Sequence, residues 1–301
     1  MAGPTHGTNP PADELNFGLV TGQHWLSWEE IRAQWEWADA TGWDSAWTFD
    51  HILSLYDGDG GPCMEGWTLL AALAALTSNV QLGLMVSSIT HRNPSLLAKE
   101  AVTVDVISGG RSILGVGAGW SVRDHEAYGW ELPPPGERVD RFGETMEIYR
   151  LLETSERTNF NGTYYTLKDA PFAPKPVFAH IPILIGSTGR RMMRHVARYA
   201  DQWDAGGTPE EYRATGERLN ALCREIGRDP AEIRWVYAAG GDPLESPERF
   251  EEHVRAYAEI GVRSFMFDFP RGDATPAMSI IAEKVIPRLR RAFGEPEHNP
   301  H

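Results

Sequence analysis

Short apolar runs alternate with amphipathic helical patterns along most of this 301-residue chain. Ser27 followed by Glu30 forms a capping box, which predicts a helix that begins there and continues to about Ala40. Each later apolar run also precedes a helical pattern, as is typical of repeated strand–helix units. The predicted strands occupy residues 15–20, 45–49, 80–87, 111–115, 182–186, 202–205, 234–239 and 263–269.

Eight strands that alternate with helices predict an α/β protein with a (β/α)8 TIM barrel. A doubly wound sheet is the alternative, and the even spacing of the units favours the barrel. Residues 154–181 interrupt the alternation, and Asn161 with Gly162 predicts a small hairpin there, so we expect an insertion between strands four and five. Residues 1–13 are expected to be a flexible N-terminus, and residues 14–301 to form one barrel domain.

Composition narrows the function classes. The net charge of -14 disfavours nucleic acid and anionic membranes as partners, because both repel an acidic surface. The two cysteines, Cys63 and Cys223, are too few for a disulfide framework, which fits a reducing compartment. The first residues lack the pattern of a signal peptide, and no apolar run approaches the ~20 residues of a membrane span. We therefore expect a cytoplasmic protein.

In a barrel of this kind the loops at the carboxyl ends of the strands form the active face. The residues at those ends are polar or small in this chain. Asp50 and His51 follow strand two, Ser87 ends strand three, and Gly117 and Gly186 lie at the ends of strands four and five. We expect these residues to meet in one site.

Two glycine-containing segments are candidate ligand sites. Residues 186–189 read Gly-Ser-Thr-Gly before Arg190 and Arg191, and this start of a helix would suit a phosphate, although an ordinary N-cap explains the same residues. The glycines within residues 115–119 would let a planar ligand lie against the backbone. That segment lacks the remaining residues of a dinucleotide fingerprint, so an NAD-type site is disfavoured.

Histidines and tryptophans near the strand ends give weaker signals. His24, His51 and His91 fall near the ends of strands one to three, but no H-x-H or i,i+4 pair supports a metal site, and none is predicted. Tryptophans are core residues by default, although four adjoin strand ends and are candidates to face a flat ligand. These four are Trp47, Trp67, Trp120 and Trp203.

Several segments together carry a family resemblance. They are WTFDH (47–51), LAK (97–99), TVDVISGGR (103–111), GVGAGW (115–120), PGER (135–138), PKP (174–176), PILIG (182–186) and ARYAD (197–201). With these segments the chain resembles the bacterial luciferase-like barrel superfamily, in particular its actinobacterial oxidoreductases that use the deazaflavin coenzyme F420. The resemblance covers nearly the whole chain, from about Leu15 to Phe293.

The resemblance implies a deazaflavin ring across the mouth of the barrel, with FMN as the alternative cofactor. It implies His51 as the acid/base, with Asp50 orienting it or contacting the ring. It also implies a non-prolyl cis bond between Met85 and Val86. The implied cofactor-binding residues are Asp50, Met85, Val86, Ser87, Gly117, Ala118, Gly119, Trp120, Gly186, Ser187 and Thr188.

The resemblance also suggests a substrate. Relatives that act on a sugar phosphate carry an acidic residue where this chain has Trp120 and a tryptophan where it has Leu55. We therefore expect hydride transfer between coenzyme F420 and a small organic substrate that is not a sugar phosphate. The alternatives are an FMN-dependent luciferase-like monooxygenase and a non-catalytic flavin-binding protein.

A homodimer is expected from the family and from the helix near residues 66–77, whose apolar residues occupy more than one side. Those residues are Trp67, Leu69, Leu70, Leu73 and Leu76.

Overall fold

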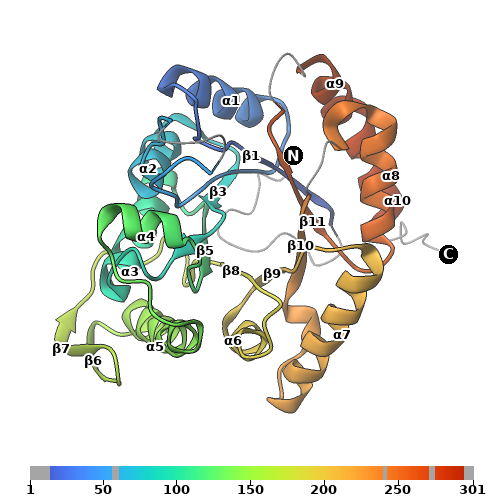
Figure 1. Ribbon diagram of the computed structural model, residues 1–301. Coiled ribbons are helices and arrows are strands. Elements are labelled where there is room, and N and C mark those ends of the chain that lie inside the picture. Colours follow the sequence, from blue (N-terminus) through green and yellow to red (C-terminus); the bar gives the residue numbers. More distant parts are fainter. Residues whose placement is uncertain (1–13, 56–60, 240–242, 271–274, 295–301) are drawn as a thin grey trace.

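The structure is a computed structural model that describes residues 14–55, 61–239, 243–270 and 275–294. The expected flexible segment, residues 1–13, lies outside the described residues. Helices surround a central ring of strands (Figure 1). Among the described helices, none combines the length and the apolar character that crossing a membrane requires.

Parallel strands form a closed barrel within the described residues. Neighbouring strands pair in the order β3-β2-β1-β11-β10-β9-β8-β5, and β3 also pairs with β5, which closes the ring. The expected (β/α)8 TIM barrel is confirmed, because a doubly wound sheet would remain open. The barrel strands are β1 (Asn16–Val20), β2 (Ser45–Thr48), β3 (Gln81–Leu84), β4 (Ser87–Ser88), β5 (Ser112–Gly117), β8 (Ile183–Gly186), β9 (Gln202–Asp204), β10 (Arg234–Ala239) and β11 (Ser264–Asp268).

The third barrel strand consists of two pieces, β3 and β4, where the sequence predicted one continuous strand. Both pieces pair with β5: Leu82 and Gly83 at its start, then Ser87 opposite Val116 farther along. The interruption falls between Leu84 and Ser87. It gives the barrel an irregular wall at the mouth, where a site is expected.

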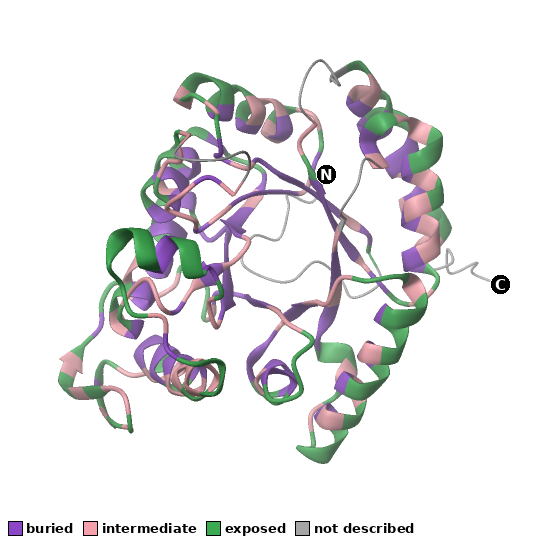
Figure 2. Cartoon of the chain, viewed as in Figure 1, coloured by how far each residue is buried: buried purple, intermediate pink, exposed green. Residues whose placement is uncertain are grey.

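Helices cover the outside of the barrel, with buried sides inward and exposed sides outward (Figure 2). The capping box of Ser27 and Glu30 is present at the start of the first helix. Asn93 caps the third helix, and Gly109 ends it with a left-handed φ of 71°. The helices are α1 (Trp28–Ala40), α2 (Gly66–Leu76), α3 (Pro94–Ser108), α4 (Val122–Tyr128), α5 (Pro135–Thr154), α6 (Met192–Tyr199), α7 (Pro209–Glu225), α8 (Pro247–Ala258), α9 (Thr275–Ile280) and α10 (Ile286–Phe293), with a π-helical turn at Ile281–Val285.

The short helix α4 was not predicted from the sequence, which indicated only a long loop after strand four. Ser121 caps it, since its Oγ accepts a hydrogen bond from the backbone N–H of Asp124 at 3.3 Å. Gly129 ends it with a φ of 71°. Seven residues make two turns, too few for a clear hydrophobic period.

The insertion between barrel strands four and five contains an antiparallel hairpin, β6 (Arg157–Asn161) and β7 (Thr166–Pro171). It lies outside the barrel beside α5 (Figure 1). The carboxylate of Glu144 on α5 accepts hydrogen bonds from three successive turn amides, those of Thr163, Tyr164 and Tyr165, at 2.6, 3.0 and 3.1 Å. The predicted hairpin is therefore present, and α5 anchors its turn.

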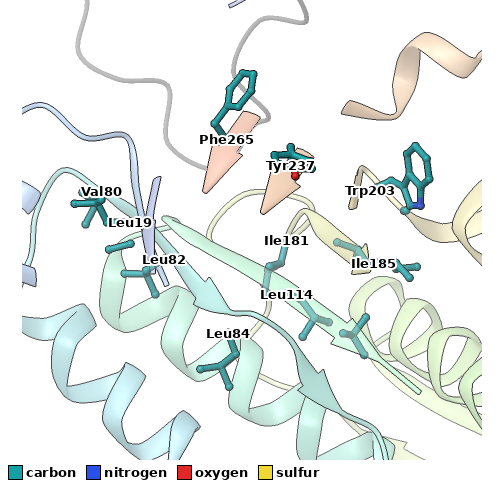
Figure 3. Close-up of a cluster of buried hydrophobic side chains, with 14 of the residues drawn as sticks. Leu19, Val80, Leu82, Leu84, Leu114, Ile181, Ile185, Trp203, Tyr237 and Phe265 are labelled. Carbon is teal, nitrogen blue, oxygen red and sulfur yellow. The ribbon is translucent and has the colours of Figure 1, made fainter. Parts of the chain in front are cut away.

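The core has two layers, because alternate strand residues point to opposite faces. One layer fills the barrel and includes Val20, Trp47, Ile113, Leu184, Val236 and Met266. The larger layer lies between strands and helices, and Figure 3 shows part of the buried apolar cluster, including Leu82 and Ile185. The barrel is filled below its mouth, so it acts as a rigid base for the site.

Candidate functional site

A cavity of about 470 Å³ opens at the carboxyl ends of the barrel strands. The lining residues come from the ends of barrel strands two to six and from the loops that follow them. They are Asp50, His51, Met85, Val86, Ser87, Ser88, His91, Gly117, Ala118, Gly119, Trp120, Ser121, Gly186, Ser187, Thr188, Met192, Asp204 and Ala205. Every site residue predicted from the sequence lies in this lining.

His51 follows β2 and pairs with a residue that sequence analysis did not single out. Its Nδ1 lies 2.7 Å from Oδ2 of Asp124 on α4, and the Asp124 side chain is 2% exposed. A carboxylate only accepts hydrogen bonds, so Nδ1 donates the hydrogen in this pair, and no hydrogen bond engages Nε2 among the residues that the structure describes. The ring of Trp120 meets the imidazole edge-on at 5.3 Å between centroids. Such an imidazole is suited to take a proton from a ligand.

Asp50 does not hold His51, which was one of the two roles expected for it, and its contact with the cofactor ring stays a prediction. Its carboxylate binds Arg92 through two hydrogen bonds of 2.6 and 2.8 Å, and it also accepts the backbone N–H of Ser88 at 2.7 Å. Burial by itself would raise the pKa of Asp50, but the hydrogen bonds and charges of Arg92 and His91 outweigh it and hold that pKa below its ordinary value. Asp50 therefore fixes β4 at the mouth, and His51 is held by Asp124 instead.

Met85, Val86 and Ser87 form the irregular wall between β3 and β4. The peptide bond between Met85 and Val86 is cis, as expected. Gly117 lies opposite them at the end of β5. A Cβ at this position would lie 2.9 Å from Cγ2 of Val86, so a side chain there would crowd Val86. Val86 and Gly117 therefore approach each other closely at this side of the cavity.

Residues 186–188 line the cavity, and helical hydrogen bonding begins just after them, since the carbonyl of Gly189 accepts the backbone N–H of Met193 at 2.9 Å. α6 begins at Met192, and Arg191 at its N-cap position makes no side-chain capping bond. Arg191 instead pairs with Asp140 on α5. The backbone N–H of Ser187 donates to the carbonyl of Asp204 at 3.0 Å, so the candidate phosphate contacts are the amide of Thr188 and the hydroxyls of Ser187 and Thr188. A contribution of Arg190 or Arg191 to a phosphate site stays a prediction.

Asp204 was missed by the sequence analysis, although it ends a strand that was predicted. It lines the cavity, and its Oδ1 accepts a hydrogen bond from the backbone N–H of Ala238 at 3.2 Å. Burial raises the pKa of Asp204 to about 6, against the effect of nearby backbone amides. The cavity thus holds two carboxyl groups in opposite environments, a common arrangement where proton transfer occurs.

Of the remaining candidates, His91 lines the cavity, whereas His24 and three of the four tryptophans do not. Trp47, Trp67 and Trp203 are buried in the core, so of the four tryptophans only Trp120 faces the cavity. His24 contacts the Sγ of Cys63 at 3.5 Å. Burial raises the pKa of the Cys63 thiol to about 12, which keeps it protonated. Among the described residues, no three His, Cys, Asp or Glu side chains converge as a metal site requires.

A filled parallel barrel with an imidazole base and an irregular third strand at its mouth defines a class of barrel enzymes that bind their ligand at the carboxyl ends of the strands. The model of the luciferase-like monooxygenase family matches residues 8–289 of the chain. The chain belongs to this family. The expected family and the expectation of an enzyme are both confirmed.

Similar proteins include users of both expected cofactors. An F420-dependent glucose-6-phosphate dehydrogenase of Amycolatopsis mediterranei (strain U-32) is 35% identical, over 84% of this chain and 92% of that protein. An F420-dependent secondary alcohol dehydrogenase, solved with an F420-acetone adduct, is 19% identical with a TM-score of 0.80, over 90% of this chain and 98% of that one. A riboflavin lyase solved with modified FMN and riboflavin is 14% identical with a TM-score of 0.80, over 94% and 93%. At these identities the two solved structures show a shared fold.

The expectation that the substrate is not a sugar phosphate is contradicted by the dehydrogenase relative, whose name specifies one. The expectation rested on the residue types at two positions, and the structure places these two side chains differently. Trp120 lines the cavity and is 65% exposed, whereas Leu55 is not among the lining residues.

Proposed function

We propose that the protein is an F420-dependent dehydrogenase that oxidises a hydroxyl group of a sugar-phosphate substrate. The observation that carries the proposal is the imidazole of His51, which lines the cavity at the barrel mouth and is held through Nδ1, with no hydrogen bond to Nε2 from any described residue. The cofactor and substrate class rest on the dehydrogenase relative. A non-catalytic flavin-binding protein would have no need of an oriented base.

The residues present fit a flat cofactor. A volume of about 470 Å³ is within the usual range of small-molecule sites, roughly 300–1,000 Å³. Gly117 and Gly186 leave the backbone bare on two sides, and a side chain at Gly117 would press on Val86. Ser187 and Thr188 offer hydroxyls for a phosphate or a polar chain. These residues would hold the deazaflavin between the third, fourth and fifth barrel strands.

When bound, the deazaflavin supplies a ring carbon that accepts a hydride. The protein's part is to orient the substrate and to move one proton. Nε2 of His51 takes the hydroxyl proton as the substrate carbon gives up its hydride, and Asp124 faces the positive imidazole ring. Asp50 stays ionised against Arg92 and holds the wall of the cavity.

Two titrations and one turnover assay test the proposal. Purified protein is titrated with F420 and with FMN, and the bound deazaflavin is then followed by its visible absorbance after glucose 6-phosphate is added. We expect tight binding of F420 and its reduction by the sugar phosphate. Binding of FMN alone would favour the monooxygenase alternative, and binding of F420 without reduction by any sugar phosphate tested would overturn the substrate class.

A homodimer is also part of the proposal, although the apolar residues of α2 that predicted it support it less than expected. Leu69, Leu70 and Leu73 of α2 are buried within their own chain. The support now comes from exposed aliphatic residues, Leu76 on α2 and Leu96, Val106 and Ile107 on α3, which are 41–51% exposed. Light scattering at micromolar concentration should give twice the monomer mass, and a monomer alone would refute the dimer.

The cytoplasmic location remains a proposal as well. It rests on the acidic composition and on Cys63 and Cys223, which are both free thiols.

A further inference from the structure

We propose that Asp124 is the positioning residue of the site: it fixes the tautomer of His51 and faces the positive charge that the imidazole gains with a proton. This proposal rests on the proposed function, because it assigns a partner to the same base. The proposal gives this role to Asp124 and not to Asp50, although Asp50 is the residue next to His51 in the sequence.

Asp124 is held in a single orientation. Oδ2 contacts Nδ1 of His51 at 2.7 Å, and Oδ1 accepts the backbone N–H of Leu53 at 3.3 Å. Its own backbone N–H donates to Oγ of the N-cap residue Ser121 at 3.3 Å. The residue is 1% exposed. With both oxygens engaged and no room to rotate, the carboxylate presents a fixed acceptor to the imidazole.

Asp50 cannot serve as the partner of His51. Both of its oxygens bind the guanidinium of Arg92, at 2.6 and 2.8 Å, and one also accepts the N–H of Ser88. Its side chain is 1% exposed behind that ion pair. The two aspartates at the barrel mouth therefore have different roles. Asp50 holds β4 in the wall of the cavity, and Asp124 orients the imidazole of His51.

The pairing has a chemical consequence. A hydrogen on Nδ1 leaves the lone pair of Nε2 available to the ligand, and proton uptake at Nε2 makes an imidazolium 2.7 Å from a buried carboxylate. The proton passes from the substrate hydroxyl to Nε2 and then to solvent, while Asp124 neither gains nor loses one. In the serine-protease triad a buried aspartate has this role. Its replacement by asparagine lowers the turnover of the enzyme roughly 10⁴-fold, because the histidine then adopts the wrong tautomer.

The first test reads the tautomer in the free protein, without cofactor or substrate. Protein labelled with ¹⁵N-histidine is assigned at His51 by comparison with His51→Ala, and ¹H–¹⁵N correlation spectra distinguish a protonated Nδ1 from a protonated Nε2. We expect Nδ1–H in the wild type and in Asp124→Glu, and a shift towards Nε2–H in Asp124→Asn. Wild-type protein with Nε2–H, or Asp124→Asn with an unchanged tautomer, would overturn the proposal.

The matched control is Asp201→Asn. Asp201 also holds a histidine, with Oδ2 at 2.7 Å from Nε2 of His180, but it precedes β9 at the end of the barrel away from the cavity. The Asp201→Asn variant makes the same chemical change in another carboxylate–imidazole pair. The spectrum of His51 should be unaltered in this variant, and an equal change in both variants would indicate a general loss of structure.

The second test measures turnover with the F420 substrate found for the wild type. Asp124→Asn should lower kcat by roughly 10² to 10⁴ with KM and F420 affinity within about threefold, and Asp124→Glu should recover part of it. A purely structural role would instead weaken binding and stability together. If the wild type uses no F420, the proposed function fails, yet the tautomer spectra still decide the role of Asp124.

Discussion

His180 makes the stability of the protein depend on pH in a way that can be measured without any ligand. Its Nδ1 lies 2.9 Å from Glu153 and its Nε2 lies 2.7 Å from Asp201. Burial lowers the pKa of His180, but the hydrogen bonds and charges of the two carboxylates outweigh it and raise that pKa from 6.5 to about 9. The folded protein therefore favours the protonated ring.

The size of the effect follows from these two values. Each pKa unit is worth about 1.4 kcal/mol, so the difference sets an upper limit of about 3 kcal/mol for His180. The side chain is 30% exposed, and solvent screening lowers the expected contribution to about 2 kcal/mol. Because the pKa is raised in the folded state, this stabilisation is complete below about pH 6.5 and is lost as the pH rises through 9.

The assay is urea unfolding of the wild type and His180→Gln at pH 6, 7.5 and 9.5, roughly the start, middle and end of the linkage window. Groups that titrate in both proteins cancel in the difference between the two unfolding free energies. Glu153 and Asp201 keep their backbone donors, Ile181 and Ile183, in the variant. The difference should be largest at pH 6 and shrink towards pH 9.5. A difference that does not change with pH would refute the ion-pair reasoning.

Three further predictions concern the site and its wall. His51→Ala should lower turnover by ~10² to 10⁴ with nearly unchanged F420 affinity, and single-turnover kinetics at the wild-type rate would make His51 only a wall of the cavity. Arg92→Leu should destabilise the fold by about 3–5 kcal/mol in urea unfolding, because it leaves Asp50 buried without its cation, and a loss under about 1 kcal/mol would contradict this. Gly115→Ala should lower the unfolding free energy by about 1–3 kcal/mol, since a Cβ there would lie 2.0 Å from the backbone oxygen of Leu84. Gly186→Ala, with its nearest atom at 3.9 Å, is the matched control for stability and should change it little.

The sequence predicted those features of the site that depend on strand order. Asp50, His51, Gly117 and Gly186 could be placed together because the carboxyl ends of parallel strands meet at one face of a barrel. The partners of the two chemical groups could not be predicted in this way. Asp124 lies 73 residues after His51, on a helix too short to show a period, and Arg92 lies 42 residues after Asp50.

Adjacency in the sequence was misleading at Asp50 and His51. Successive residues at the end of a strand point in different directions, so neighbours along the chain turn to different partners. The missed residue Asp204 is a different case, because it lies near the end of a predicted strand, residues 202–205, and a carboxyl there could have been included. The sequence also does not show side-chain exposure, so it could not be predicted that Trp120 lines the cavity while 65% exposed.

Because of the short helix α4, residues that affect the chemistry of the site can change independently of the residues that form the barrel. Val122 and Tyr128 on α4 are 54% and 51% exposed, so much of its surface can change without disturbing the packed barrel. The helix also carries Asp124, whose carboxylate lies 2.7 Å from the imidazole of His51 in the loop after β2. A small tilt of α4, produced by substitutions on its outer side or by a molecule bound there, would alter that distance. Libraries confined to this seven-residue segment thus offer a route to new reactivity while the core sequence stays constant.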